Sequence, residues 1–344
     1  MRFLLTEEQR DFGRSVAARL AAAEVPAVAR AWAAGDPGPG RAVWRGLAET
    51  GLFALAAPEE GAAGDAGGLG SLAVVAAVGF VEVGRAGAPG PLVETAATAA
   101  LLSALGEDRT TKRFLPGLLS GDTTATLRLP GSGPYAVDAD RVDHVFTVTP
   151  AGELRVLAGG PDTPTVPSLD PSRRLGLPAG DTAGELLASG ERVLAAARAA
   201  ESWARLLTAA QVLGVGGALL TRTVQYAGQR AQFGVPIGSF QAVKHRLADT
   251  LLGLEFARPL LWAAAATLEG PGPEGAAVGP VAAAKLAAGE AAYAAAGTAL
   301  RVHGAVGYTE ELDLSLWLRR ARPLRDAWGT PARCRELVVT HGAG

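Results

Sequence analysis

The stretch RAQFGVPIGSFQAVKHRLAD, residues 230–249, joins two helical segments through a turn bent by glycine and proline. Arg230, Gln232 and Phe233 lie within four residues of that turn, whereas an ordinary connection between helices needs only a few polar turn residues. A guanidinium offers five donors and a permanent charge, which suit a pyrophosphate, and an aromatic ring can stack on a flat heterocycle. The alternative is a plain surface turn in which Arg230 lies over Phe233. From these residues alone both interpretations stay open.

The segments around this turn have the spacing of helices. Helices are expected from about Leu186 onward, and residues 195–229 predict one long helix with close-packing glycines at 214, 216 and 217. Ser239 is placed to cap the helix after the turn. That helix has an apolar face made by Phe240, Val243, Leu247, Leu251, Leu254 and Leu261. A third helix ending at Gly304 and two shorter ones predict a C-terminal four-helix bundle.

The first two thirds of the chain divide into a helical part and a small β part. Thr6 is placed to cap the first helix, and the run SLAVVAAVGFVEVGRAG (71–87) is apolar nearly all round, which predicts a buried central helix. Short alternating runs such as TTATLRLP, HVFTVTP and LRVLAGG predict strands. The sequence therefore predicts a mainly α protein with a small β domain. Its predicted divisions are an N-terminal helical domain (1–120), a reduced middle β domain (121–185) and a C-terminal helical bundle (186–344).

Composition and charge exclude several classes of function. The 344 residues carry 32 basic and 34 acidic side chains, a net charge of −2, so no basic excess is present to bind nucleic acid. One cysteine, Cys334, allows no internal disulfide and fits a reducing cytoplasm. The N-terminus meets Glu7 and Glu8 too early for a signal peptide, and the apolar run at 72–81 is too short to cross a bilayer. We therefore expect a cytoplasmic protein that binds no membrane.

Metal and hydrolase sites are not indicated. The four histidines (144, 245, 303 and 341) show no metal-ligand spacing, and the chain has no CxxC, HExxH, G-x-S-x-G or Walker pattern. A glycine-rich loop is expected at 61–70.

A second stretch, RVHGAVGYTEELDLSLWLRRA (301–321), carries charge at the end of a predicted helix. Arg301 and His303 flank a glycine turn there, and backbone N–H groups with nearby charge can bind a phosphate. The alternative is a glycine cap at which His303 bonds locally. Both interpretations again stay open.

Several stretches together resemble the FAD-dependent acyl-CoA dehydrogenase family along the whole chain. LTEEQRDF, WRGLAETGLFALAAPEE and VEVGRAGAPGPLVET resemble its N-terminal part, the last as found in short actinobacterial members. RAQFGVPIGSFQAVKHRLAD is close to the family's R-x-x-F-G-x-x-I-x-x-F-Q signature, and RVHGAVGYTEE resembles its Q-x-H-G-G-x-G-[FY]-T-x-E segment. The resemblance implies an acyl-CoA dehydrogenase-like fold, FAD as cofactor, an acyl-CoA substrate and an electron-transfer acceptor.

The resemblance also implies a cofactor site shared between subunits. In the family, the turn crosses a dimer interface and holds the FAD pyrophosphate and adenine of a neighbouring subunit. Carried over, the FAD contacts are Arg230, Ala231, Gln232, Phe233, Phe240, Gln241, Arg301, His303, Gly304 and Ala305. Two positions depart from the family pattern. Arg301 replaces the usual glutamine and keeps the ability to bind phosphate, while Ala305 adds a methyl where the backbone should approach the cofactor.

The catalytic base cannot be assigned by the resemblance. The family's usual Y-E-G-T segment aligns with AWGT (Ala327–Thr330), which places Trp328 where the glutamate should be. An indole is only a donor and cannot take a proton. The alternative base position on the long helix aligns with Ala204, and Glu201 lies one turn away. The family's T-E-P-x-x-G-S-D flavin loop has only PGSG (130–133) as a poor counterpart.

This chain thus keeps the motifs that contact the FAD of a neighbouring subunit. It lacks the base and the flavin loop that would act on an FAD of its own. That pattern resembles the smaller subunit of heteromeric acyl-CoA dehydrogenases, in which a longer partner supplies the base and the flavin-ring loop. A reduced middle domain would leave room for a large acyl group, such as a steroid side chain. Two alternatives remain: a self-sufficient homo-oligomer with an atypical base, from Glu201, Asp326 or Glu310, or a non-catalytic scaffold or acyl-CoA-binding subunit.

Overall fold

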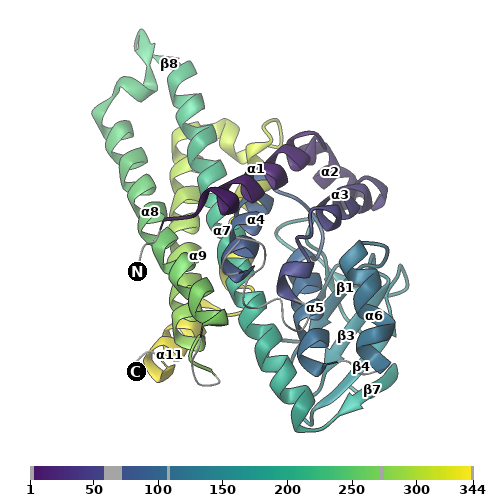
Figure 1. The fold of residues 1–344 in the computed structure, drawn as a ribbon. Helices are drawn as coiled ribbons and strands as arrows, with labels where there is room; N and C mark the ends of the chain where they lie inside the picture. Colours follow the sequence, from purple (N-terminus) through teal and green to yellow (C-terminus); the bar gives the residue numbers. More distant parts are fainter. Residues whose placement is uncertain (1–3, 58–71, 107–108, 271–274, 342–344) are drawn as a thin grey trace.

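The protein is mainly helical, with two small sheets and a hairpin beside the helices (Figure 1), which confirms the predicted fold class. The computed structural model describes residues 4–57, 72–106, 109–270 and 275–341, and the glycine-rich loop expected at 61–70 lies outside them. The helices are α1 (Glu7–Ala21), α2 (Val25–Ala34), α3 (Gly38–Glu49), α4 (Leu72–Ala86), α5 (Leu92–Leu105), α6 (Arg109–Ser120), α7 (Glu191–Gln229), α8 (Gln241–Glu269), α9 (Val278–His303), α10 (Leu314–Asp326) and α11 (Pro331–His341), with short 3-10 turns at Ala54–Ala56, Ile237–Ser239 and Gly304–Tyr308.

The N-terminal helices follow their sequence signals. Thr6 caps α1, since the Gln9 N–H donates to Thr6 Oγ1 and the Thr6 N–H donates to Gln9 Oε1, a complete capping box. Helix α4 is buried on nearly every face, as its apolar sequence predicts, because it packs between α1 and α7.

Close packing of the long helices depends on glycine at two of the three predicted positions. A Cβ on Gly214 would lie 2.0 Å from the Val81 carbonyl of α4, and one on Gly216 would lie 2.6 Å from Leu254 of α8. A Cβ on Gly217 would meet nothing within 4 Å, so the prediction for that glycine is wrong.

The middle part contains two sheets. The strands are β1 (Ala125–Arg128), β2 (Ala136–Val137), β3 (His144–Val148), β4 (Glu153–Ala158), β5 (Thr165–Val166), β6 (Leu175–Gly176) and β7 (Glu185–Ser189). One sheet has the order β1-β3-β4-β7, with β1 parallel to β3 and the other pairs antiparallel, and the second has the order β2-β6-β5. Helices were expected to return near Leu186, but β7 occupies those residues, and α7, which contains the predicted long helix, begins at Glu191. Pairing with β4 extends the segment, and Gly190 at φ 103° turns the chain into the helix.

Helices α7 and α8 are both long and apolar enough to cross a membrane by length and composition. In α7, 83% of the apolar window is buried inside the fold, as for a core helix of a globular protein, but in α8 only 28% is buried. Helix α8 therefore exposes much of its apolar surface.

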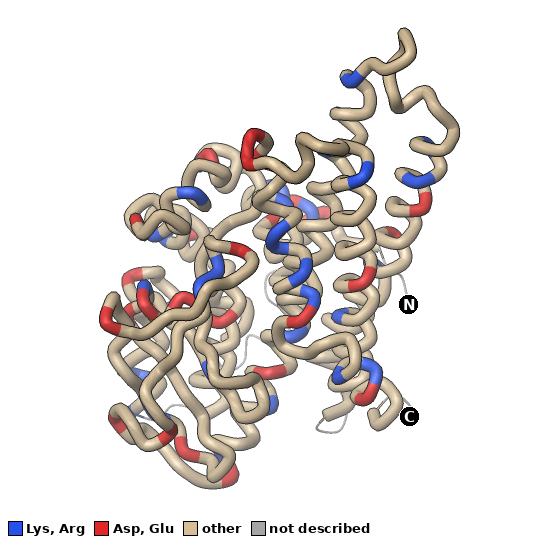
Figure 2. Tube along the Cα trace, turned by 180° about the vertical axis from the view of Figure 1, so that it is seen from behind, with Lys and Arg blue, Asp and Glu red and all other residues tan. Residues whose placement is uncertain are grey.

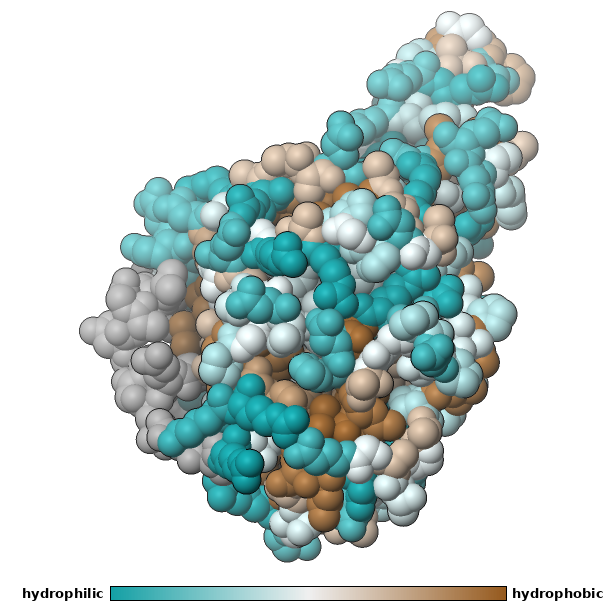
Figure 3. Space-filling view, turned by 90° about the vertical axis from the view of Figure 1, so that its right-hand side faces the viewer, coloured by the Kyte–Doolittle hydropathy of each residue, from teal (hydrophilic) through white to brown (hydrophobic). Residues whose placement is uncertain are grey.

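The ends of α7 and α8 project from the body of the molecule and are joined by a hairpin of β8 (Ala231–Gln232) and β9 (Val235–Pro236) (Figures 1 and 3). The prediction that Ser239 caps α8 is wrong. Because the chain forms a 3-10 turn before α8, the N-cap residue is Phe240, and Ser239 Oγ donates instead to the Pro236 carbonyl at 2.7 Å.

Candidate functional site

The β8–β9 hairpin presents an arginine and two aromatic rings to solvent. Phe233 and Gly234 form its two-residue turn with φ of 52° and 81°, the left-handed pair of a type I′ turn. Phe233 is 93% exposed, and its ring meets the Phe240 ring edge-on at 6.2 Å between centroids. Arg230 is exposed at the end of α7, and its guanidinium has no hydrogen-bond or ion-pair partner among the described residues. An exposed ring in a strained conformation beside an unpaired cation favours a binding role over a folding role.

The end of α9 is fixed to the end of α7. The His303 ring is buried and stacks on Tyr226 at 4.1 Å between centroids, while its Nδ1 lies 2.8 Å from the Ala299 carbonyl. Burial holds the pKa of His303 below its usual value, although the bond to Ala299 opposes this. The His303 ring thus bonds and stacks within the protein, as the local-capping interpretation expects. Only the backbone at this position is left to contact a ligand.

The residues after His303 leave the backbone accessible. Gly304 ends α9 with φ 64° and ψ −138°, a conformation that glycine adopts readily and other residues rarely do. Ala305 and Arg301 are exposed, and the Arg301 guanidinium has no partner among the described residues. The structure thus places two unpaired arginines, Arg230 and Arg301, at neighbouring helix ends. Their assignment to FAD, with that of the other motif residues, stays a prediction.

The loop aligned with the family's catalytic segment is held in place from three sides. Lys285 Nζ on α9 donates to the Arg325 carbonyl at 2.8 Å, and Arg205 Nε on α7 donates to the Trp328 carbonyl at 3.0 Å. Trp328 has φ 54°, and its indole Nε1 donates to Glu94 Oε1 at 3.1 Å. Burial lowers the pKa of Lys285 to about 8, so this lysine carries its charge at neutral pH. The Trp328 indole is therefore fixed toward Glu94.

Glu94 is the carboxylate that sequence reasoning missed. It lies on α5, is 4% exposed, and also pairs with Arg173 at 3.4 Å. One signal could have revealed it: Glu94 is the single charged residue of the α5 segment LVETAATAALLSAL. A buried charge in an apolar helix requires a partner.

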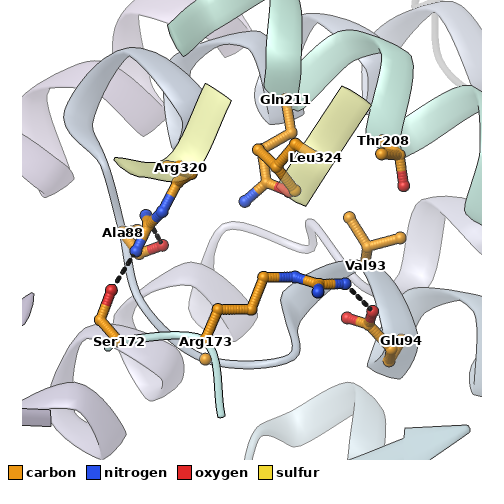
Figure 4. Close-up of a pocket in the computed structure, with 10 residues that line it drawn as sticks. Ala88, Val93, Glu94, Ser172, Arg173, Thr208, Gln211, Arg320 and Leu324 are labelled. Carbon is orange, nitrogen blue, oxygen red and sulfur yellow. Dashed lines mark hydrogen bonds and ion pairs between the residues drawn. The ribbon is translucent and has the colours of Figure 1, made fainter. Parts of the chain in front are cut away.

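A small cavity lies beside this cluster (Figure 4). Its volume is about 10 Å³, enough for one water at most. Glu94, Arg173, Thr208 and Gln211 line it, together with Arg320. Such a cavity cannot hold an acyl chain.

A buried ion pair closes the other end of this cavity. Arg320 Nε on α10 donates to Asp170 at 2.7 Å, and its Nη1 donates to the Ala88 carbonyl at 2.7 Å. Burial alone would raise the pKa of Asp170, but Arg320 and the Ser172 donors outweigh it and hold that pKa below its usual value. The pair therefore stays ionised and ties the middle part to α10.

The other base candidates do not line this cavity. Ala204 is fully buried, and Glu201 pairs with Arg205 in a separate groove of about 650 Å³. Glu310 is exposed and pairs with Arg319, which holds the pKa of Glu310 below its usual value, and Asp326 is exposed at the end of α10. Glu94 is thus the carboxylate among the residues that line the cavity.

Comparison with known proteins identifies the family. The acyl-CoA dehydrogenase N-terminal domain model matches residues 6–122, and the C-terminal domain model matches residues 194–342. Acyl-CoA dehydrogenase IpdE2 of Mycobacterium tuberculosis is 35% identical over 318 residues, which cover 92% of this chain and 91% of the relative. The chain belongs to the acyl-CoA dehydrogenase family. It is an FAD-dependent oxidoreductase of the class that acts on acyl-CoA CH–CH bonds.

Solved structures share the fold of this acyl-CoA dehydrogenase along its whole length. The ChsE4–ChsE5 complex from Mycobacterium tuberculosis matches with a TM-score of 0.81 and 25% identity, covering 100% of this chain and 99% of the other. The Tcur3481–Tcur3483 steroid acyl-CoA dehydrogenase variant matches with a TM-score of 0.78 and 25% identity, covering 98% and 99%. The predicted acyl-CoA dehydrogenase-like fold is therefore confirmed.

Proposed function

We propose that this acyl-CoA dehydrogenase is one subunit of a heteromer, in which it contributes binding residues to FAD while a longer partner supplies the catalytic base and the flavin-ring loop. One observation carries the proposal. Trp328, bonded through its indole to Glu94, occupies the position that aligns with the family's glutamate. An indole cannot remove the α-proton of an acyl thioester.

The surroundings of Glu94 support this division of labour. The cavity beside Glu94 has a volume of about 10 Å³, against the several hundred that ligand pockets need. Arg173, Arg320 and Asp170 fill its surroundings with ion pairs that are buried or nearly so. A substrate would have to break these contacts to enter.

The hairpin supports the binding role. Arg230 and Arg301 would hold the FAD diphosphate, since both are exposed cations without a partner among the described residues. Phe240 and Gln241 are exposed at the start of α8, where they would meet the adenine. When bound, FAD supplies the hydride acceptor of the family's reaction.

The exposed apolar face of α8 supports a protein partner. Leu251, Leu252, Phe256 and Leu260 are 45–72% exposed on a helix that continues from the hairpin. Apolar patches of this kind mark interfaces. The ChsE4–ChsE5 match was solved as a complex of two named proteins, and the Tcur3481–Tcur3483 match is described as a steroid acyl-CoA dehydrogenase. We therefore propose a longer acyl-CoA dehydrogenase subunit as partner and an acyl-CoA with a bulky ring system as substrate.

A second candidate function is a self-sufficient dehydrogenase. Glu94 favours it, because a buried carboxylate beside a cavity is the kind of group that acts as a base. This function requires the Trp328 loop to move so that the cavity opens.

The test compares the chain alone with the chain co-purified with an acyl-CoA dehydrogenase encoded beside it. Flavin absorbance and acyl-CoA-dependent dye reduction should appear only in the complex. Arg230→Ala should weaken FAD retention in the complex by about tenfold, as expected for one charge-assisted contact to phosphate. Arg258→Ala is the matched control, because Arg258 is an arginine of α8 that pairs with Glu255.

Turnover by the chain alone at the rate of the complex would overturn the heteromer proposal. In that case Glu94→Gln separates the two candidates, since loss of the lone chain's turnover would identify Glu94 as the base. Unchanged flavin content in Arg230→Ala would remove the binding role from the hairpin.

A further inference from the structure

Asp138 is fully buried where the N-terminal helices meet the middle part, in the turn after β2. Its Oδ1 accepts hydrogen bonds from the Trp32 indole of α2 and from the Arg174 N–H. Its Oδ2 is also buried but has no donor among the described residues. A buried carboxylate that is charged requires donors or a cation at its oxygens. The contacts of Asp138 are therefore sufficient for the neutral acid and incomplete for the anion.

Arg173 precedes Arg174 in the chain, and most of its donors are unused. Its Nη2 contacts Glu94 Oε1 at 3.4 Å, and no other hydrogen bond or ion pair engages its guanidinium among the described residues. A guanidinium has five N–H donors, and 3.4 Å is long for a charge-assisted hydrogen bond. Figure 4 shows the Arg173 side chain extended beside the small cavity, with its head group at Glu94. Arg173 is thus a nearly buried cation that is held by one weak contact.

The other charges around Asp138 are already engaged. Figure 2 shows acidic and basic positions mixed through the middle part rather than separated by sign. Charged side chains on the turn of Asp138 and on the helices next to it form ion pairs with one another: Asp140 with Arg141 and Arg174, Arg41 of α3 with Asp143, and Arg30 of α2 with Asp313. Arg173 is therefore the nearby cation with donors left for Asp138.

Asp138 and Glu94 act on the same arginine. Burial raises the pKa of Asp138 to about 7, while Arg173 lowers this pKa and Glu94 raises it. Arg173 thus lies near both carboxylates, although its contact is with Glu94. Loss of the proton from Asp138 puts a second buried negative charge beside Arg173, and a buried charge is stable only when it is paired.

We propose that Arg173 is a pH-sensitive switch, which pairs with Glu94 while Asp138 is neutral and turns toward Asp138 Oδ2 when Asp138 is ionised. The turn withdraws the Arg173 side chain from the cavity of about 10 Å³, so the cavity grows as pH rises. Glu94 then keeps the Trp328 indole as its hydrogen-bond donor. The proposal involves no cofactor and no second chain, so it does not depend on the proposed function.

Two indole N–H groups report the two carboxylates separately, because Trp32 donates to Asp138 and Trp328 donates to Glu94. The test is proton–nitrogen correlation NMR of the labelled full chain across neutral pH, with Trp32→Phe and Trp328→Phe to assign the signals. Both signals should shift with one common midpoint near pH 7. Asp138→Asn should abolish this transition in both. Lys285 holds the Trp328 loop and has a pKa of about 8, so its own titration persists in that variant.

Arg173→Gln separates the switch from a direct effect of charge. In this variant the Trp32 signal should still titrate, whereas the Trp328 signal should lose the transition. Arg174→Gln is the matched control, because that neighbouring side chain pairs with Asp140, and its Trp328 signal should titrate as in the parent. A Trp328 signal that stays constant through the Trp32 transition of the parent, or that still follows it in Arg173→Gln, would overturn the proposal.

Glu94→Gln keeps the test decisive if Arg173→Gln fails to fold. Removing the charge of Glu94 releases Arg173 to Asp138, so the Trp32 midpoint should move to lower pH. An unchanged Trp32 midpoint in this variant would show that the two carboxylates do not share Arg173.

Discussion

Trp328 has a positive φ that favours glycine and a side chain that donates to a carboxylate 234 positions earlier in the chain. The alignment of AWGT placed this tryptophan at the base position. It could not place Glu94 beside it, because the two meet only through the packing of α5 against the loop after α10. The alignment thus identified Trp328 at this position, but it could not identify Glu94 as the residue that accepts the hydrogen bond.

Trp328→Phe tests the bond between these two residues. The ring bulk is kept, but Glu94 loses one of its donors and retains Arg173. Loss of a hydrogen bond to a buried carboxylate should lower the free energy of unfolding by about 1.5–3 kcal/mol. Urea titration measures this, with Trp262→Phe as control, because Trp262 is a buried tryptophan whose indole has no hydrogen bond in the described structure. Equal losses in the two variants would show that the bond to Glu94 contributes nothing.

At the scale of elements, the sequence predicted the regular helices. It did not predict segments whose structure depends on neighbouring elements. The capping box of α1 and the apolar period of α4 and α7 are local signals, so these helices were predictable. Strand β7 is half exposed and lacks a clear alternation, and it exists because β4 offers it an edge. The cap of α8 was misassigned for a similar reason, since Ser239 belongs to a 3-10 turn that a serine before an apolar run does not reveal. At the candidate site, the sequence placed Arg230 and Arg301 at helix ends, whereas the contacts of Glu94 with Trp328 and Arg173 depend on tertiary packing.

Asp138 links three elements and gives a pH-dependent prediction. Asp138 follows β2. Its Oδ1 accepts hydrogen bonds from the Trp32 indole of α2 at 3.2 Å and from the Arg174 N–H at 3.0 Å. Burial raises the pKa of Asp138 to about 7, although these two bonds and Arg173 oppose the rise. An unfolded aspartate has a pKa of about 3.9. Between these values the folded state binds more protons, so the free energy of unfolding falls as pH rises from about 4 to 7.

Asp138→Asn should remove this pH dependence. We expect the variant and the parent to have similar free energies of unfolding at pH 4, and the variant to exceed the parent by roughly 2–4 kcal/mol at pH 8. Urea titrations at the two pH values measure it. Asp143→Asn should instead be less stable than the parent at pH 8, and this deficit should shrink as pH falls below about 4, because Thr124 and Arg41 outweigh burial and lower the pKa of Asp143. The same Asp138→Asn difference at both pH values would contradict the assignment.

At the scale of the whole molecule, two regions have opposite character. Around Glu94 and Arg320, ion pairs surround a cavity of only about 10 Å³, and the loop carrying Trp328 is held by Lys285 and Arg205. At the far end, α8 and the hairpin expose apolar side chains, and the Arg230 guanidinium has no hydrogen-bond or ion-pair partner among the described residues. The first region leaves a cavity of only about 10 Å³, whereas the projecting one exposes apolar surface that a partner could cover. This distribution is the reason to expect that function requires a second chain.

Leu252→Glu combined with Phe256→Glu tests that expectation at the interface. Both side chains are more than half exposed on α8, so the fold does not depend on them, and the thermal midpoint of the lone chain should stay the same. In the complex, two carboxylates would be buried without partners, which should weaken association with the longer subunit by at least about 100-fold. Analytical ultracentrifugation of the mixed chains measures the affinity. Val339→Glu is the control, because Val339 is an apolar residue 81% exposed on α11, away from the hairpin. Undiminished association of the double variant would place the interface elsewhere and leave the apolar face of α8 unexplained by assembly.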